Sequence, residues 1–261
     1  MYRQTGFLKA LTVLICTLLV PITNGMAVDR DSDPVEFRIL VEDHHQPFSY
    51  VLADGEVRGL SVEIIRLLLE QLKRDVKLEP VPWQRALAEH RNQRNIILAS
   101  VVRLPQREQQ FLWLGRLFRE PTLIYALRER GLKLTTVKAL ADLRIGTIRS
   151  GAAHMTLLAH GIPAAQLESV TDPLQNLRKL VAKRIDLISA QPSAIALGVR
   201  QLSLDSNQFV AVFPLLPPVD SYLTASLGSD PALVKALTDS FAVLERSGRL
   251  AELRAKAGVE Q

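Results

Sequence analysis

The feature that most constrains the fold is a regular alternation of strand and helix patterns over residues 37–102. Strand segments show apolar residues at every second position, and the segments between them repeat apolar residues at helical spacing. The last segment, residues 96–102, opens with four apolar or small residues in a row, which is typical of a buried parallel strand. The expected order is strand 37–41, helix 62–72, strand 76–81, helix 83–94 and strand 96–102.

The same alternation restarts after Pro121. Three prolines, Pro214, Pro217 and Pro218, are expected to interrupt the extended chain in its last part, because proline cannot donate a backbone hydrogen bond within a sheet. The expected elements are strands 123–127, 144–148, 185–189, 209–213 and 222–227, and helices 137–143, 173–184 and one that opens at residue 231.

Capping residues support three of the predicted helices. Ser61 is placed to cap the first long helix. Asp172-Pro173 and Asp230-Pro231 each combine a capping aspartate with a proline at the first helical position, and Gly248 is expected to close the last of these helices.

Two blocks of alternating strands and helices predict an α/β protein with two lobes. Extended segments near residues 120–127 and 218–225 would join the lobes twice. A cleft between lobes is a preferred ligand site, and paired strand connections permit the lobes to close around a ligand.

The N-terminus has the layout of a secretory signal peptide. Basic Arg3 and Lys9 precede an apolar stretch over residues 10–20, and small residues Gly25 and Ala27 flank Met26. We expect cleavage near Ala27, which leaves a chain of 234 residues and lowers the formal charge from +5 to +3. Cys16 is the only cysteine and lies in the apolar stretch, so we expect a protein without disulfides and without a lipid anchor.

Other classes of protein find little support in the sequence. Basic residues are scattered through helical stretches without interleaved aromatic residues, so we expect no nucleic-acid partner. His44 and His45 are adjacent in an extended segment and point to opposite sides, which disfavours binding of one metal ion by both. Sequence motifs of serine hydrolases, phosphate-binding loops and zinc peptidases are absent, and we expect no cofactor and no catalytic residues.

Arg107 is the strongest single candidate for ligand binding. It follows the buried strand over residues 96–102, and the carboxyl ends of strands are where ligands bind in open α/β sheets. A guanidinium group matches the geometry of a carboxylate, so this placement predicts capture of a small anionic or zwitterionic molecule. The alternative is a surface arginine on a loop.

The chain resembles the periplasmic solute-binding proteins of amino-acid ABC transporters, the bacterial extracellular solute-binding proteins of family 3. The resemblance implies the two-lobed fold of type II periplasmic binding proteins, with two crossover segments between the lobes. It rests on the order and spacing of several landmarks along the chain: residues 46–50, Gly55 and Gly59 around a hairpin, Trp83 with residues 85–87, residues 105–108, residues 111–115, residues 140–146, residues 176–180 and residues 184–186.

The resemblance also assigns ligand-binding residues. The family's carboxylate-binding arginine falls on Arg107, its strand-end donor on Ser100, and its acidic residue after the first strand on Glu42. The family's aromatic residue over the ligand falls within residues 45–48, where Phe48 is our candidate. In the second lobe, residues 147–153 would form a turn whose amides bind the carboxylate at a helix N-terminus, with Arg149, Ser150 and Gly151 as candidates.

The sequence departs from the family pattern at two places. Gln191 stands where amino-acid binders usually have the aspartate that holds the ligand's ammonium group. A neutral amide cannot balance a buried ammonium, and this puts an ordinary free amino acid in doubt. Leu104 replaces the usual threonine of the arginine turn, and Arg103 brings a second guanidinium beside the cleft.

For several of these residues, a purely structural role is an open alternative to ligand binding. Trp83 either contacts the ligand or anchors its helix to the sheet. Arg85 is expected to pair with Glu89 one helical turn on. Glu42 either binds a cationic group of the ligand or is an exposed acid.

These observations together predict a secreted, monomeric solute-binding protein of the periplasm that delivers a small carboxylate-bearing ligand to the permease of an ABC transporter. Alternatives are a periplasmic enzyme on the same fold, similar to a dehydratase, with Glu42 as general acid, and a ligand-carrying partner of a membrane receptor. The predicted boundaries are residues 1–27 for the signal peptide, 28–121 and 222–261 for the first lobe, and 122–221 for the second lobe.

Overall fold

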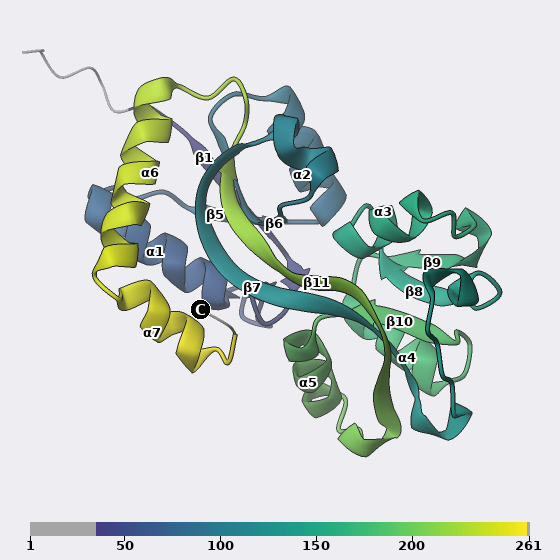
Figure 1. The fold of residues 1–261 in the computed structure, drawn as a ribbon. Coiled ribbons are helices and arrows are strands. Elements are labelled where there is room, and N and C mark those ends of the chain that lie inside the picture. Colours follow the sequence, from purple (N-terminus) through teal and green to yellow (C-terminus); the bar gives the residue numbers. More distant parts are fainter. Residues whose placement is uncertain (1–34, 260–261) are drawn as a thin grey trace, which may run out of the picture. The chain divides into compact units, whose positions relative to one another are not determined.

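A computed structural model of the chain describes residues 35–259. These residues belong to one compact unit, Val35–Gln261. The predicted signal peptide and Cys16 lie outside the described residues. The described part contains one eight-stranded sheet, ordered β5-β1-β6-β11-β7-β10-β8-β9, and one three-stranded sheet, ordered β2-β3-β4. Helices cover the large sheet in both lobes (Figure 1).

The first lobe is built on parallel strands. Strand β1 pairs in parallel with β5 on one side and with β6 on the other, and β6 pairs with β11 in the antiparallel direction. The elements of this lobe are β1 (Arg38–Glu42), α1 (Leu60–Leu72), β5 (Leu78–Val81), α2 (Trp83–Asn92), β6 (Ile96–Val102), η1 (Pro105–Gln110), α6 (Pro231–Arg246) and α7 (Arg249–Lys256).

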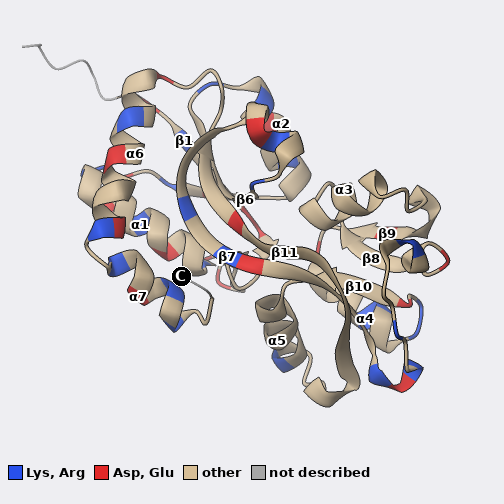
Figure 2. Cartoon of the chain, in the orientation of Figure 1, with Lys and Arg blue, Asp and Glu red and all other residues tan. Residues whose placement is uncertain are grey.

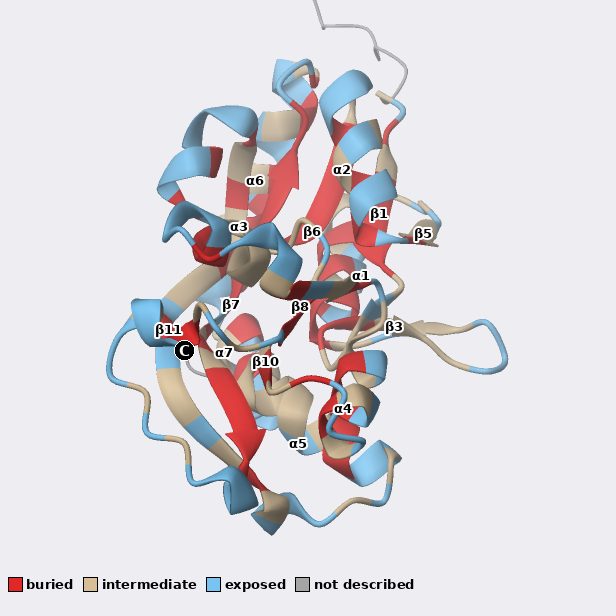
Figure 3. Ribbon diagram, turned by 90° about the vertical axis from the view of Figure 1, so that its right-hand side faces the viewer, coloured by how far each residue is buried: buried red, intermediate tan, exposed pale blue. Residues whose placement is uncertain are grey.

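Alternate residues of β1 face two separate cores. Ile39 and Val41 pack with the helices α1 and α6, whereas Leu40 packs with Trp83 and Ala86 of α2. Since neighbouring side chains of a strand point to opposite faces, α2 covers one face of the sheet and α1 and α6 cover the other. Figure 3 shows the buried strands between the partly exposed helices.

The second lobe has the strand order β7-β10-β8-β9. Here Ile124 and Ala126 of β7 face one core, and Tyr125 and Leu127 face another. The elements of this lobe are β8 (Ile145–Ile148), α3 (Ala152–Ala159), β9 (Leu167–Val170), α4 (Pro173–Val181), β10 (Leu187–Ala190) and α5 (Pro192–Gln201), with short 3-10 helices η2 (Arg128–Arg130), η3 (Val137–Leu140), η4 (Ala164–Gln166) and η5 (Ser206–Gln208).

Two long strands, β7 (Leu112–Leu127) and β11 (Phe209–Ala225), run through both lobes as an antiparallel pair (Figure 1). The prediction that three prolines interrupt β11 was wrong. The strand continues through them with shifts in register, for example between Pro214 and Leu216. Such irregularities let a strand tolerate a residue that lacks an N–H group. The predicted lobe boundaries fall at or inside these shared strands and stay a prediction.

Two of the predicted caps are confirmed and one is wrong. Asp172 accepts a hydrogen bond from the Leu174 amide at 2.9 Å, and Asp230 accepts one from the Ala232 amide at 2.8 Å. Helix α1 begins instead after Gly59, whose φ of 123° lies in a region that L side chains rarely adopt. Ser61 lies inside the helix, and its hydroxyl bonds to that of Ser100.

The other local predictions had mixed outcomes. The hairpin expected around Gly55 is formed by β3 (Ser49–Val51) and β4 (Val57–Arg58), which make a small sheet with β2 (His44–His45). The helix expected over residues 137–143 is only the single 3-10 turn η3. The prediction that Gly248 closes α6 is confirmed: it directly follows the C-cap Ser247, its φ of 80° is left-handed, and its amide donates to the Glu245 carbonyl at 3.2 Å.

Candidate functional site

Arg107 bridges the two lobes. It lies in η1, just after β6, and only 3% of its surface is exposed. Its Nη1 donates a hydrogen bond to the Val102 carbonyl of the same lobe at 3.2 Å. Its Nη2 donates to the Ser150 carbonyl at 3.2 Å and contacts the Met155 sulfur at 3.4 Å, and both of these partners come from the second lobe. The alternative of a surface arginine on a loop is therefore excluded.

The Arg107 guanidinium has no anionic partner within residues 35–259. Its contacts are two carbonyl oxygens, a thioether and the ring of Trp83, whose centroid is 5.7 Å away. Burial lowers the pKa of Arg107 to about 10, so the group is still charged at neutral pH. A buried charge without a counter-charge is costly, and an anion brought to this place would relieve that cost.

Trp83 donates to the Ser150 carbonyl, the same acceptor that Arg107 uses. This residue begins α2, and its indole Nε1 donates to the Ser150 carbonyl at 3.1 Å. It also packs in the core between α2 and the sheet, as the anchoring alternative expects, and contact of Trp83 with a ligand stays a prediction. The neighbouring Gln84 donates from Nε2 to the Ser150 hydroxyl at 3.2 Å. Three side chains of the first lobe thus meet Ser150 of the second.

The backbone of the turn before α3 presents the Ser150 carbonyl to the first lobe. Ser150 has a φ of 58°, in the left-handed region. Gly151 is the N-cap residue of α3, and its amide donates to the Ile148 carbonyl at 3.0 Å. The first amides of the helix proper have no partner within a helix, and they would serve an anion here. The Arg149 side chain is exposed.

A cavity of about 610 Å³ adjoins these contacts. It lies between α2 and α3, which face each other across the two lobes in Figure 1. Arg107 and Ser150 form part of its wall, and none of the residues that line it is acidic. The lining residues are Gln84, Leu87, Ala88, Arg91, Arg107, Gln110, Phe111, Ser150, His154, Met155 and Leu158.

A second group of polar residues joins the lobes around His45. His45 Nδ1 lies 3.6 Å from Glu42 Oε2 of β1, and the side chain of Gln191 from the second lobe lies near the His45 ring. Burial and the nearby Asp43 raise the pKa of Glu42 to about 8. Burial lowers the pKa of His45 to about 4, although the Gln191 contact opposes that shift. Both groups are thus mainly neutral at pH 7.

Glu42 and Gln191, which the sequence proposed as selectivity residues, therefore lie near a common neighbour. Of the two alternatives for Glu42, the exposed acid is excluded, since only 7% of its surface is exposed. His45 was inside the range that the resemblance assigned to the aromatic residue. Phe48 is fully buried in the core of the first lobe, where its ring stacks on Phe118 at 3.6 Å between centroids. His45, not Phe48, stands beside Glu42.

Two other candidates lie away from the cavity. The Ser100 hydroxyl is buried and bonds to Ser61 Oγ at 2.9 Å. Arg103 is exposed, and its Nε donates to Glu108 Oε2 at 2.9 Å. The Arg103 guanidinium lies over the rings of Trp113 and Tyr222, at 5.1 Å and 5.3 Å from their centroids. The structure does not bring Arg103 to Arg107.

Sequence reasoning missed His154 in the cavity wall. Its Nδ1 lies 3.1 Å from Thr147 Oγ1 and 3.0 Å from Ser169 Oγ. Burial, together with the charge of Arg149, lowers the pKa of His154. The sequence did contain a signal for His154, because this residue directly follows residues 147–153, which were expected to form the binding turn, and lies in the first turn of α3.

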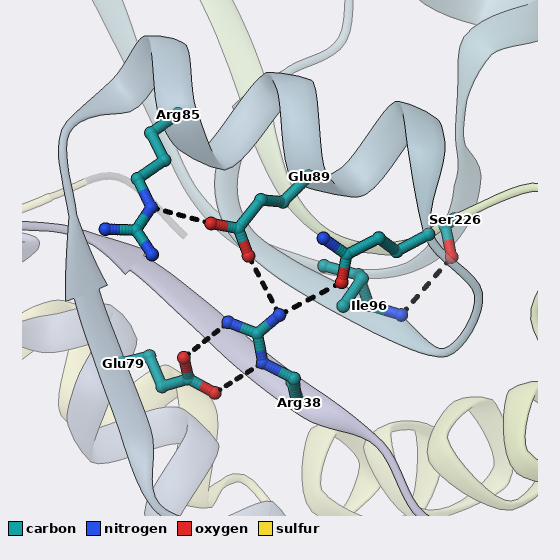
Figure 4. Close-up of polar contacts among 7 residues, drawn as sticks. Arg38, Glu79, Arg85, Glu89, Ile96 and Ser226 are labelled. Atoms are coloured by element: carbon teal, nitrogen blue, oxygen red, sulfur yellow. Dashed lines mark hydrogen bonds and ion pairs between the residues drawn. The ribbon is translucent and has the colours of Figure 1, made fainter.

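Arg85 forms the expected surface ion pair. Its Nε donates to Glu89 Oε1 at 2.7 Å, one helical turn on, and Glu89 also pairs with Arg38 at 2.8 Å. Figure 4 shows this network, in which Arg38 additionally binds Glu79. None of these four residues lines the cavity beside Arg107.

A cluster of metal ligands and a membrane-spanning helix are both absent from residues 35–259. Across residues 35–259, no group of three or more His, Cys, Asp or Glu side chains could hold a metal ion. No helix in the described part is both long and apolar enough to cross a membrane. Acidic and basic residues are interspersed over both lobes (Figure 2).

Comparisons with known proteins agree with this architecture. The family model of the bacterial extracellular solute-binding proteins, family 3, matches residues 37–259. No curated protein sequence matches the chain.

Solved structures show the same two-lobed fold. A histidine kinase sensor domain similar to periplasmic binding proteins is 19% identical with a TM-score of 0.78, over 86% of this chain and 97% of that one. EhuB in complex with hydroxyectoine is 23% identical with a TM-score of 0.77, over 86% and 88%. The arginine-, lysine-, histidine-binding protein ArtJ from Geobacillus stearothermophilus is 12% identical with a TM-score of 0.73, over 85% and 94%.

Proposed function

Because the chain belongs to family 3 of the bacterial extracellular solute-binding proteins, we propose that it captures a small carboxylate-bearing ligand between its two lobes. Delivery of that ligand to the permease of an ABC transporter completes the proposed function. The proposal places the mature chain in the periplasm, after removal of a signal peptide near Ala27.

The observation that carries this proposal is the buried, unpaired guanidinium of Arg107. A guanidinium has five N–H donors, and the two carbonyl contacts leave others for a ligand. Hydrogen bonds between charged groups are roughly twice as strong as neutral ones. A carboxylate would therefore displace the Ser150 carbonyl from Arg107 or bind beside it, and the first amides of α3 would donate to the same anion.

Within the second polar group, none of the side chains of Glu42, His45 and Gln191 offers a fixed negative charge to the amino end of an amino acid. Glu42 and His45 are mainly neutral at pH 7, and Gln191 carries no charge. A ligand ammonium there would need Glu42 to lose its proton. This favours a related polar compound over an ordinary free amino acid, although a cationic ligand group would itself favour ionised Glu42. The named relatives bind hydroxyectoine and basic amino acids, and both classes belong in a first screen.

A thermal-shift screen with amino acids, opines, small peptides and dicarboxylates is the first experiment. At roughly 100 times its dissociation constant a ligand stabilises the folded protein by about 2.7 kcal/mol. For a chain of this size the midpoint should rise by about 5 to 10 °C.

Calorimetry on variants then tests whether the buried Arg107 guanidinium binds the ligand. Arg107→Gln should weaken binding of the best ligand by about 2 to 5 kcal/mol, because one partner of a buried charge pair is removed. Arg66→Gln, on the solvent side of α1, is the matched control and should bind as the parent does. Equal affinity of Arg107→Gln and parent would refute the role of Arg107.

One observation favours a second candidate, an enzyme of the dehydratase type. Glu42 keeps its proton near neutral pH and could donate it as a general acid. Incubation of the ligand with the protein separates the two functions: a binding protein returns the ligand unchanged, and an enzyme forms product that is lost in Glu42→Gln.

A further inference from the structure

The cavity beside Arg107 is longer than a single carboxylate needs. One face of α2 lines it, through Gln84, Leu87, Ala88 and Arg91. Gln84 marks the end at which Ser150 and Arg107 lie, because it donates to the Ser150 hydroxyl. Arg91 lies seven residues further along the helix, and at the rise of an α-helix this is about 10 Å.

The cavity wall contains two cationic side chains, Arg107 and Arg91, together with several apolar ones. The apolar side chains include Leu87 and Phe111 of the first lobe and Met155 and Leu158 of α3. Arg91 forms no hydrogen bond or ion pair with the described residues, and its side chain is exposed. The polar lining residues Gln110 and His154 add no negative charge.

The space continues past Arg91. A second cavity of about 350 Å³ shares four lining residues with the first, Leu87, Arg91, Gln110 and Phe111. It extends to Leu227, of which 59% is exposed. Arg91 is therefore a wall residue of both spaces, and a long ligand that passes Leu87 meets it.

We propose that the preferred ligands are elongated acids with an anionic group at each end of an apolar chain, the first bound by Arg107 and the second by Arg91. This inference rests on the proposed function, since it takes Arg107 as the site of the first carboxylate. The two α2 positions that mark the ends of the cavity wall, Gln84 beside Ser150 and Arg91, are about 10 Å apart along the helix, and the wall that they belong to combines Arg107, Arg91 and apolar side chains. A free amino acid would occupy only the Arg107 end.

A chain-length series tests the proposal. The probes are succinate as the short diacid, suberate and sebacate as long diacids, and octanoate and decanoate as monoacids of matched length. Calorimetry with the parent protein should show affinity rising from succinate to the long diacids. Each long diacid should bind about tenfold more tightly than its monoacid, as one added charge-assisted contact would give. A long chain that ends in a phosphonate separates a carboxylate-specific contact from a general anion contact at Arg91.

Two arginines of the same helix supply the variant and its control. Arg91→Gln should remove the difference between each diacid and its monoacid and leave monoacid affinity unchanged. Arg85→Gln, whose guanidinium pairs with Glu89 and lines neither cavity, should keep the full difference. Both residues are exposed, and thermal melts of both variants should match that of the parent.

The outcomes separate this inference from the proposed function. Equal affinity for short and long diacids, or an unchanged preference in Arg91→Gln, overturns the inference while loss of binding in Arg107→Gln still supports the function. The same holds if an amino acid binds through Arg107 and no diacid binds. If Arg107→Gln binds every acid as the parent does, both the function and the inference are refuted.

Discussion

Arg107 and Glu42 are both buried without a partner of opposite charge, and burial has a different result for each: Arg107 stays charged at neutral pH, whereas Glu42 is mainly neutral. The guanidinium stays charged despite a lowered pKa, whereas the carboxyl of Glu42 keeps its proton up to about pH 8. The resting site therefore has one net positive charge at Arg107 and a neutral polar group around His45. This distribution suits a ligand whose acid end is fixed first and whose other end is recognised by hydrogen bonds or by a second cation.

The raised pKa of Glu42 predicts a pH-dependent difference in stability between the parent and Glu42→Gln. Between about pH 5 and 8 the folded parent holds a proton on Glu42 that the unfolded chain has released, so its free energy of unfolding falls as pH rises. Glutamine has no such proton. The unfolding free energy of Glu42→Gln relative to the parent should rise through this range, by at most about 1.4 kcal/mol for each pH unit.

Chemical denaturation of both proteins at several pH values measures this difference. The depressed pKa of His45 acts below about pH 6.5 and raises stability as pH rises, but it is common to both proteins. A difference that stays constant from pH 5 to 8 would show that Glu42 is ionised in the folded protein.

At the scale of elements, helix α6 combines a strong cap with a buried face. Asp230 accepts hydrogen bonds from the amides of Ala232 and Leu233, and Phe241 and Leu244 pack in the first-lobe core. Asp230→Ala should lower the free energy of unfolding by about 1 kcal/mol. Asp239→Ala, in the same helix but in an exposed pair with Lys235, should change it by less than about 0.5 kcal/mol. Equal effects in denaturant melts would contradict the role of the cap.

The elements also show what the sequence could and could not predict. Helices such as α4 and α6 follow from local signals, because their caps and apolar spacing act within a few residues. The continuity of β7 and β11 could not be predicted, because a partner strand far away in sequence supplies their hydrogen bonds and tolerates Pro121 and Pro214.

The candidate site residues show the same contrast: positions set by local sequence could be predicted, and positions set by residues distant in sequence could not. The end of β6 placed Arg107 in a buried position, as its sequence context indicated. The choice between His45 and Phe48 depended on Phe118, which stacks on Phe48 from another strand. The exposure of Arg103 depended on Glu108 and two aromatic rings, and none of these contacts has a periodic signal in the sequence.

At the scale of the whole molecule, one carbonyl group of the second lobe accepts hydrogen bonds from two side chains of the first. Trp83 and Arg107 of the first lobe both donate to Ser150 of the second. A bound carboxylate competes for the same donors, so ligand entry and the contact between lobes are linked.

Tryptophan fluorescence provides a readout of this link. The chain has two tryptophans, and Trp113→Phe leaves Trp83 as the only tryptophan. Binding of an acid should then shift or quench the emission of Trp83, because its Ser150 contact and the charge of Arg107 beside its ring both change. The added change Arg107→Gln should abolish the response. An acid that binds to Trp113→Phe without any change in emission would argue against a site at Trp83.

The most direct test of the central claim is a crystal structure of the protein with its tightest-binding acid. We predict a carboxylate within hydrogen-bond distance of the Arg107 guanidinium, enclosed by residues of both lobes that include the turn at Ser150. A ligand bound elsewhere, with Arg107 still donating to the Ser150 carbonyl and to no anion, would contradict the claim.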